Sequence, residues 1–361
     1  MIIDIVTANP PYQVSRQLAA DKIKINMGNT PALNRLIDMA AANSGIDNRY
    51  VVMPDAFDNG EEKFFYKQDG SVYSPSTKER MGLYEKWSKI LGDKALCGLL
   101  DNNKINAKEV DKIVTISCTG FYAPGVDNFL IDKFSLSKNI RREHIGFMGC
   151  SASIIGLTSA IEALRSPAIN NVIIISQEIS SIHLQYEPSR DNILSNMIFA
   201  DGCAAVLLSK NENLKPKLDI LSTKSILFKD SSEYMGWRIG NNGFQMILSS
   251  ELPKIILGTA APELINILKE WGVQKENIKH WALHPGGRAI LDALQKGLSL
   301  TDEEMHPSRE VLRNYGNMSS ASILFVLKEI LNTKKVSKDE FVCAVAFGPG
   351  LSMEVALLRG L

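Results

Sequence analysis

The chain has 361 residues, of which 45% are hydrophobic and 22% are charged, and these proportions are ordinary for a globular protein. Its 40 basic side chains balance 40 acidic ones, so no net field attracts it to nucleic acid or to an anionic membrane surface. Asp4 interrupts the first apolar run, where a signal peptide needs an unbroken one, and later apolar runs are too short to cross a bilayer. We therefore expect a cytoplasmic protein that neither binds nucleic acid nor inserts into a membrane.

Short runs of β-branched residues alternate with longer helical patterns along the chain, which is typical of a layered α/β protein. Continuous runs of Val and Ile predict strands that are buried on both faces. We expect such strands at residues 110–117, 171–177, 218–222, 279–283 and 341–346. No low-complexity linker separates the halves of the chain, so the sequence predicts one compact unit.

One short sequence occurs twice. The segment beginning at Cys150 reads Cys-Ser-Ala-Ser-Ile, and the segment beginning at Ser319 reads Ser-Ser-Ala-Ser-Ile. Each opens a stretch that is apolar nearly all round, residues 154–164 and 323–331, as expected of a helix at the centre of a layered fold. The repetition suggests two similar halves.

The five cysteines of the chain match neither a zinc site nor a disulfide framework, because their number is odd and their spacing is unpaired. We therefore expect no bound metal. Cys150 is distinctive because it follows Gly-Phe-Met-Gly at a predicted turn from strand to helix. Unpaired amide groups and the helix dipole favour negative charge there, so we expect an acidified thiol. The alternative is an inert buried thiol, and the local sequence does not decide between them.

His284 follows a predicted strand and precedes Pro285-Gly286-Gly287, a segment that turns the chain sharply and lets an imidazole project into a cleft. We interpret His284 as a catalytic base. Asn317 precedes the second central helix, where its amide can donate a hydrogen bond to an oxyanion, although a helix-capping asparagine is the plainer alternative.

Cys150, His284 and Asn317 form a chemically complete set of nucleophile, base and neutral donor. A papain-like hydrolase is one class that uses such a set, and the separation 284 − 150 = 134 fits its spacing. The position of the cysteine in the middle of the chain does not fit that class.

The second class is the condensing enzymes, and from about residue 110 onward the chain resembles the chalcone-synthase-related type III polyketide synthases of the bacterial kind. Six segments in order carry the resemblance, and their Gly-Asn-Met-Ser-Ser-Ala sequence separates this group from ketoacyl-carrier-protein synthases and thiolases. They are residues 120–127, 149–150, 199–202, 284–287, 315–321 and 347–351. The resemblance implies a thiolase-like, five-layered α-β-α-β-α fold. Its related halves would be residues 1–215, with the cysteine, and 216–361, with the histidine and asparagine.

The resemblance also implies a mechanism. An acyl-CoA starter is transferred to Cys150, whose thiolate is maintained by ion pairing with His284. Malonyl-CoA loses carbon dioxide between His284 and Asn317, which stabilise the enolate, and the enolate attacks the thioester. Phe199 favours decarboxylation through its apolar ring. No cofactor is implied beyond the CoA thioesters, and the protein is expected to be a homodimer.

The same resemblance implies roles for further residues. Phe244 is expected to gate the junction of tunnel and cavity. The other side chains expected to line the cavity are Cys118, Thr119, Ser180, His183, Ser319, Phe347 and Gly348.

Two departures from the plant enzymes are visible. Residues 36–43 lack the basic side chains that bind the CoA phosphates, and we take Arg35 and Arg49 as substitutes. Ala123 replaces a methionine that reaches into the partner subunit. The bacterial-type segment Ser-Ser-Ile-His at residues 180–183, together with the small residues Ala123 and Cys118, favours a medium or long acyl-CoA starter and an alkylpyrone or alkylresorcinol product. The alternatives are a tetrahydroxynaphthalene-type synthase, a single-step ketoacyl synthase, a Cys-His-Asn hydrolase and a catalytically silent partner subunit.

Overall fold

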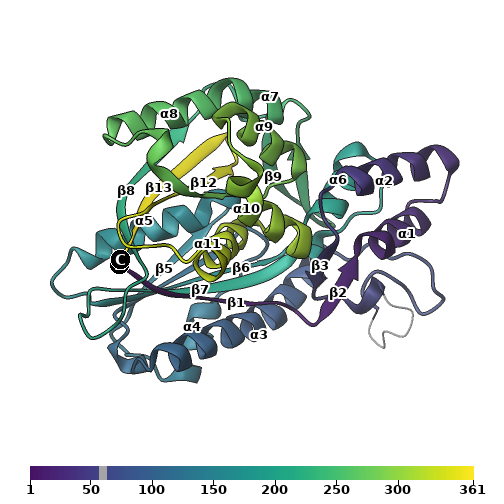
Figure 1. The fold of residues 1–361 in the computed structure, drawn as a ribbon. Coiled ribbons are helices and arrows are strands. Elements are labelled where there is room, and N and C mark those ends of the chain that lie inside the picture. Colours follow the sequence, from purple (N-terminus) through teal and green to yellow (C-terminus); the bar gives the residue numbers. More distant parts are fainter. Residues whose placement is uncertain (57–62) are drawn as a thin grey trace.

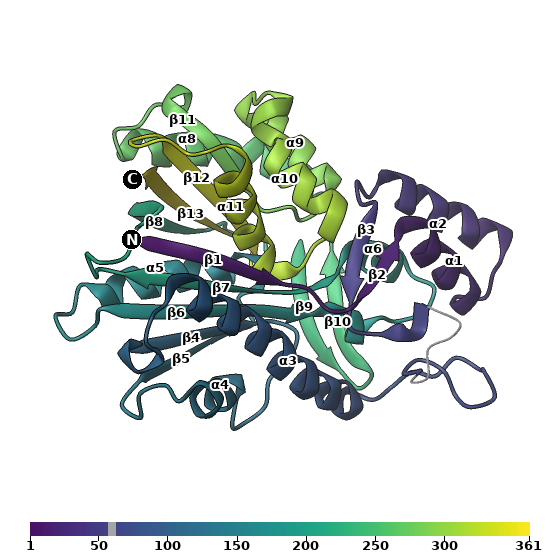
Figure 2. The ribbon, with the colours of Figure 1, turned by 60° about the horizontal axis from the view of Figure 1, so that its bottom comes forward.

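The computed structural model describes residues 1–56 and 63–361, and its main feature is a nine-stranded sheet (Figures 1 and 2). The strand order is β11-β12-β13-β8-β1-β7-β6-β4-β5. The strands are β1 (Ile2–Ala8), β4 (Lys112–Ser117), β5 (Arg141–Gly146), β6 (Asn171–Ile179), β7 (Asp201–Ser209), β8 (Leu218–Leu227), β11 (Ile278–Leu283), β12 (Phe341–Gly348) and β13 (Ser352–Gly360). All five strands predicted from Val and Ile runs are present, and β8 continues five residues beyond its predicted end at residue 222.

The sheet consists of two halves with the same pairing pattern. In the first half β4 is parallel to β6, β6 is antiparallel to β7, and β7 is antiparallel to β1. In the second half β11 is parallel to β12, β12 is antiparallel to β13, and β13 is antiparallel to β8. The halves meet where Ile2 of β1 pairs with Leu218 of β8. The repeated order of parallel and antiparallel pairs supports the duplication that the sequence echo suggests.

Helices cover both faces of each half and give five layers. The central layer contains α5 (Ala152–Leu164) and α11 (Ser322–Thr333), whose apolar side chains share one core with strands of both halves. The outer face of the first half is covered by α3 (Thr77–Asn103) and α4 (Val126–Phe134). The outer face of the second half is covered by α8 (Ala261–Glu270), α9 (Arg288–Leu298) and α10 (Asp302–Tyr315). The predicted thiolase-like layering is confirmed.

Smaller elements flank this body. The short strands β2 (Tyr12–Ser15) and β3 (Asn48–Val51) pair with each other, and the helices α1 (Arg16–Asn26) and α2 (Pro31–Asn43) project beside them and pack against α6 (Arg190–Ile198) (Figure 1). A hairpin of β9 (Met235–Gly240) and β10 (Gly243–Leu248) precedes α7 (Leu252–Ile255) and a π-helical turn (Ile256–Ala260). Within residues 1–56 and 63–361, no helix is long and apolar enough to span a bilayer.

Local sequence signals explain where several helices begin. Ser76 and Glu79 form a capping box at the start of α3, and Thr301 and Glu304 form another at the start of α10. The central helices begin differently, because each follows a 3₁₀ turn, Gly149–Ser151 before α5 and Ser319–Ala321 before α11. These two turns face each other, since Ser153 Oγ donates to the carbonyl oxygen of Ser320 at 2.6 Å. The repeated sequence therefore brings its two copies together at the middle of the molecule.

Candidate active site

Cys150 lies in the 3₁₀ turn immediately before α5 and is buried. The preceding Gly149 has a left-handed φ of +66°, and a Cβ at Gly149 would lie 2.1 Å from Cδ of Pro349. A Cβ at Gly348 would likewise lie 2.4 Å from Ser151 Oγ. The end of β12 and the residue after it therefore pack closely against the turn that carries Cys150. Glycine is needed at Gly149 and Gly348 because a side chain at either position would clash.

His284 is placed by the end of β11. Its amide donates to the carbonyl oxygen of Val345 at 2.9 Å, which continues the parallel pairing of β11 with β12. The ring is buried, and neither ring nitrogen has a hydrogen-bond partner among the described residues. An unpartnered buried imidazole that lines a cavity is available to a substrate.

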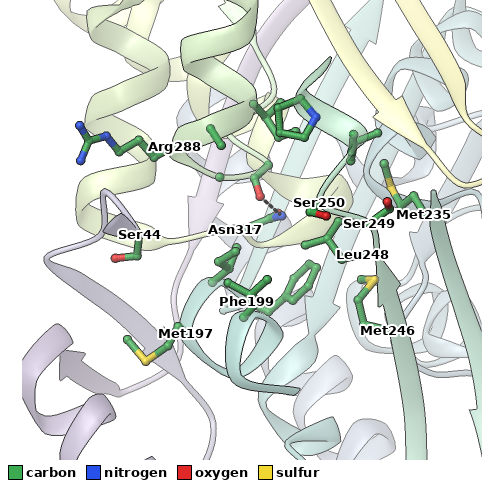
Figure 3. A pocket seen from close by; sticks show the side chains of 18 of the residues that line it. Ser44, Met197, Phe199, Met235, Met246, Leu248, Ser249, Ser250, Arg288 and Asn317 are labelled. Atoms are coloured by element: carbon green, nitrogen blue, oxygen red, sulfur yellow. Dashed lines mark hydrogen bonds between the residues drawn. The ribbon is translucent and has the colours of Figure 1, made fainter. Parts of the chain in front are cut away.

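Asn317 is held by backbone and side chain. Its amide donates to the carbonyl oxygen of Ile198 at 3.0 Å, and its carbonyl accepts from Ala200 at 2.9 Å, so it brackets Phe199. Its side-chain Oδ1 accepts from the amide of Ser319 at 2.8 Å, and its Nδ2 donates to the carbonyl oxygen of Gly286 at 3.2 Å (Figure 3). The orientation of the amide is thus fixed, and the second hydrogen on Nδ2 remains for a substrate oxygen.

The structure brings Cys150, His284, Asn317 and Phe199 together on one cavity of about 290 Å³. The Cys150 thiol lies 4.0 Å from Oδ1 of Asn317. Most of the remaining wall is apolar and comes from α6, the β9–β10 hairpin, α7 and the start of α9 (Figure 3). None of these wall residues was predicted from the sequence; among them are Leu194, Met197, Met235, Met246, Leu248, Leu252, Ile256 and Ile290.

The expected acidity of Cys150 is wrong for this structure. Burial raises the pKa of the Cys150 thiol to about 12, and this effect outweighs the hydrogen bonds from Ser319 and Asn317 that lower the pKa. Burial also lowers the pKa of His284 to about 3. The free site therefore holds a neutral thiol and a neutral imidazole, because the closed pocket disfavours both charges. No hydrogen bond joins the two side chains in the described part of the chain.

A second cavity of about 30 Å³ lies on the inner side of Cys150. It is lined by four of the residues that were expected there, Cys118, Thr119, Ser180 and Ser319. His183 and Phe244 line a third cavity, of about 20 Å³, next to it. Phe347 lines the large cavity, whereas Gly348 lines none of these three and contacts the cysteine turn instead. The substrate contacts of this set stay predictions.

Phe244 does not lie at the junction of the cavities. Its side chain is only 1% exposed and stacks on His183 with the ring centroids 4.2 Å apart. Met246, two residues along β10, lines all three cavities. Alternation in a strand puts both residues on one face, so the sequence could identify that face but not which member reaches the junction.

Arg49 cannot bind a CoA phosphate in this structure. It is 6% exposed, and its Nη1 donates to the carbonyl oxygen of Phe199 at 2.9 Å, so its guanidinium supports the phenylalanine from within. Arg35 is exposed on α2 but does not line the large cavity. Arg190 and Arg288 line that cavity instead, and the Arg288 side chain points outward (Figure 3). These two cations were missed because each begins a helix far from α2 in sequence.

Glu178 is a further buried group that the sequence did not reveal. Its carboxylate accepts from the Cys118 amide at 2.9 Å, from the Thr119 hydroxyl at 2.8 Å and from the Ser320 hydroxyl. Burial raises the pKa of Glu178. The carboxylate fixes the loop beneath the inner cavity to the turn that follows Asn317.

Two family models match the chain. One is described as FAE1/Type III polyketide synthase-like protein and matches residues 69–223, and the other, Chalcone and stilbene synthases, C-terminal domain, matches residues 219–361. Alpha-pyrone synthesis polyketide synthase-like Pks18 of Mycobacterium tuberculosis is 28% identical over 98% of this chain and 89% of its own length. The 1,3,6,8-tetrahydroxynaphthalene synthase of Streptomyces peucetius is 29% identical over 74% of this chain and 72% of its own length.

Polyketide synthase 37 of Dictyostelium discoideum is 31% identical over 82% of this chain, which spans only 10% of that much longer relative. Among solved structures, PKS-I from the brown alga Ectocarpus siliculosus matches with a TM-score of 0.93 at 29% identity, over 100% of this chain and 98% of that chain. Because two related models together match residues 69–361 and the fold agrees along its whole length, the chain belongs to the type III polyketide synthases, the malonyl-CoA-dependent condensing acyltransferases related to chalcone synthase.

Proposed function

We propose that this protein loads an acyl-CoA starter onto Cys150 and extends it with malonyl-CoA, and that the product is cyclised to an alkylpyrone or alkylresorcinol. The observation that carries the proposal is the large apolar cavity that opens on Cys150, His284 and Asn317 together. Its volume of about 290 Å³ is near the lower end of the range for pockets that enclose a small organic ligand. Two relatives are named for cyclised products, the alpha-pyrone synthesis polyketide synthase-like Pks18 and the 1,3,6,8-tetrahydroxynaphthalene synthase, which is in keeping with this proposal.

In the loading step, His284 accepts the thiol proton as the Cys150 sulfur attacks the starter carbonyl. The sulfur–carbon bond forms, the bond to CoA breaks, and the CoA thiolate takes the proton. The neutral state of both groups in the free pocket supports this order, in which the charges arise only during the reaction. A resting thiolate–imidazolium pair, which the resemblance implied, would need two buried charges in a pocket that disfavours both.

In the extension step, the malonyl thioester carbonyl lies between His284 and Asn317. The bond between the malonyl carbon and its carboxylate breaks, carbon dioxide leaves, and the electron pair of that bond forms an enolate whose oxygen accepts hydrogen bonds from the Asn317 Nδ2 and from the ring N–H of neutral His284. The apolar ring of Phe199 disfavours the malonyl carboxylate and favours its loss. The enolate carbon then attacks the Cys150 thioester, and the thiolate leaves. These reactions need no cofactor beyond the CoA thioesters.

The lining of the cavity suits a CoA thioester because it includes two arginines, of which Arg288 is ion-paired with Asp292 at 3.6 Å. Arg190 and Arg288 line the cavity and are in place for the CoA phosphates, while the apolar wall suits an acyl tail. A tetrahydroxynaphthalene-type enzyme would load malonyl-CoA itself, and the apolar wall is less suited to a carboxylate-bearing starter.

A homodimer is part of the proposal. Strand β5 ends the sheet, and among the described residues it pairs only with β4. Phe121 and Ile239 are 51% and 55% exposed, and both are neighbours of Phe244, the first by ring contact and the second by strand pairing. Exposed apolar side chains and a free strand edge are each typical of a subunit interface. A charged residue at either position, F121D or I239D, should lower the mass measured by light scattering from dimer to monomer.

The division at residue 215 is also proposed, and the break between β7 and β8 supports it. A cytoplasmic location is proposed as well, and the balanced charge is in keeping with a protein that has no nucleic-acid partner.

The test is intact-protein mass spectrometry after incubation with malonyl-CoA and a series of acyl-CoA starters, with the small products analysed in parallel. We expect acyl adducts on the wild type, no adduct on C150A, and pyrones or resorcinols in the wild-type reaction. Adducts and products from malonyl-CoA alone would assign the tetrahydroxynaphthalene-type activity instead. Absence of both with every starter would contradict the proposal and leave a silent subunit.

A further inference from the structure

Arg49 lies on the short strand β3, outside the cavities that hold the reacting groups, and its side chain reaches inward to the site. Its Nη1 donates to the carbonyl oxygen of Phe199 at 2.9 Å. The backbone end of the same residue is packed closely, because a Cβ added at Gly316 would lie 3.3 Å from the Cβ of Arg49. Gly316 directly precedes Asn317 and has a left-handed φ of +69°. The position of the Arg49 donor is therefore fixed by the segment that carries Asn317.

The backbone at Phe199 is held by hydrogen bonds on three sides. Its amide donates to the carbonyl oxygen of Ser195 at 3.0 Å. The residues on either side of it exchange two hydrogen bonds with the backbone of Asn317, at 2.9 and 3.0 Å. These three bonds join backbone groups, whereas the Phe199 carbonyl accepts from the Arg49 side chain. The orientation of that peptide group therefore depends on a side chain from a distant strand.

The guanidinium of Arg49 is a strong donor for this purpose. Burial lowers the pKa of Arg49 to about 10, so the group is still charged at neutral pH. Asp201 favours the charge, but the Asp201 carboxylate accepts from the Val52 amide and from the amide and hydroxyl of Ser181. A charged donor makes a hydrogen bond about twice as strong as a neutral donor does. The bond to the Phe199 carbonyl is thus stronger than an ordinary backbone contact.

The position of Phe199 matters to every part of the site, because this residue lines the large cavity and both small ones. We propose that Arg49 is a positioning residue for decarboxylation, which acts by holding the Phe199 carbonyl and thereby the aromatic ring. The inference rests on the proposed function, in which Phe199 serves the extension step and not the loading step. Without the guanidinium the Phe199 peptide can rotate and displace the ring, and a displacement of about 1 Å can slow a reaction by roughly 100-fold.

The test compares R49M and R49K with the wild type. R49M keeps an unbranched side chain but removes the charge and the donors, whereas R49K keeps a charged donor with a shorter reach. Carbon dioxide release from malonyl-CoA gives kcat and KM for decarboxylation, and intact-protein mass spectrometry gives the rate of starter loading on Cys150. R49M should lower the kcat of decarboxylation by roughly 10- to 100-fold, with KM and the loading rate within about threefold of the wild type. R49K should fall between R49M and the wild type.

A double variant tests whether Arg49 acts through Phe199. F199A removes the ring and keeps the carbonyl, so R49M should add less than about threefold to the loss of decarboxylation that F199A causes alone. Losses that multiply in the double variant would overturn the proposal, because they would show that the two residues act independently.

R16M is the matched control. Arg16 pairs with Asp47 at 3.5 Å at the surface, on the segment that leads into β3, and R16M should leave both rates unchanged. A folded R49M with the wild-type kcat, or one that loses loading and decarboxylation equally, would overturn the proposal. If R49M does not fold, R49K decides by the same ratio of the two rates. A wild type that neither loads a starter nor releases carbon dioxide would instead contradict the proposed function, so the two failures are distinguishable.

Discussion

The two segments that open the central helices, residues 150–154 and 319–323, have nearly the same sequence, but the turns around them contribute different groups to the site. The first turn presents its leading residue, Cys150, to the cavity. In the second turn the equivalent residue is Ser319, and the group on the large cavity is Asn317, which corresponds to Met148 of the first turn. One duplicated backbone element therefore supplies the nucleophile from one position and the oxyanion donor from another.

The turns also differ in where the left-handed backbone falls. In the first it falls on Gly149, before the nucleophile, and in the second it falls on Ser319 itself, with φ of +46°. Glycine adopts such a φ freely, whereas a residue with a Cβ does so at a cost. The two segments thus occupy equivalent places in the fold but differ in local backbone geometry. Substitutions made in pairs at equivalent positions can show which residues have the same role in both segments and which have a role in only one.

The largest expected effect is from C150A, set against S319A at the equivalent position. C150A should reduce product formation more than about a thousandfold, because no other group forms the thioester, while some malonyl-CoA decarboxylation remains. S319A should retain condensation. Product and carbon dioxide are measured separately; loss of both activities in C150A would show that the enolate site depends on the thiol.

The next effect is from N317A, set against M148A. Loss of one oxyanion donor should slow decarboxylation by roughly 10²–10³-fold and leave starter loading on Cys150 nearly unchanged. Met148 is exposed, so M148A should affect neither step. Carbon dioxide release and intact mass report the two steps, and an equal loss of both in N317A would contradict the assignment of Asn317 to the enolate.

The protonation state of Cys150, in the first turn, should appear in the pH dependence of its alkylation. A thiol whose pKa is raised to about 12 is neutral at pH 7, and its reactive thiolate fraction grows as pH rises. The rate of Cys150 alkylation by iodoacetamide should therefore increase about tenfold per pH unit between pH 7 and 9. C150A corrects for labelling of the other cysteines. A rate that is constant across this range would indicate a resting thiolate.

The smallest effect concerns stability. G149A should lower the free energy of unfolding by about 2–4 kcal/mol, because its Cβ meets Pro349 and its φ is left-handed. S319G places glycine at a left-handed φ and should change the free energy of unfolding by no more than about 1 kcal/mol. Denaturant unfolding of both variants measures the difference, and equal losses would show that the two turns bear the same strain.

The strands and the two central helices were predictable from local signals, whereas the five-layered fold and the meeting of Cys150, His284 and Asn317 were implied by the resemblance to type III polyketide synthases. Val and Ile runs marked the strands, and the repeated sequence marked the two central helices. The Gly-rich segments marked the turns at which a strand or a helix ends. These features depend on neighbours in sequence, so one chain carries them without any knowledge of its packing.

The interior of the site was predictable only in part, since it depends on contacts between distant elements. Arg49 looked available for phosphate, but its guanidinium is directed at the Phe199 carbonyl, 150 residues away. Phe244 was expected at the junction, but Met246, on the same strand face, is the residue that lines all three cavities. The acidity expected of Cys150 followed from helix geometry, whereas burial by surrounding elements controls its pKa.

Glu178 links the loop at Cys118 and Thr119 to the turn at Ser320 through hydrogen bonds. Its carboxylate accepts hydrogen bonds from Cys118 and Thr119 of the first half and from Ser320 of the second. A buried carboxylate is costly without its donors, so the floor of the inner cavity and the turn that carries Asn317 must move as one piece. The size of the inner cavity and the position of Asn317 therefore both depend on Glu178. We expect substitutions in the Cys118–Thr119 loop that enlarge the inner cavity to alter the rate of decarboxylation as well.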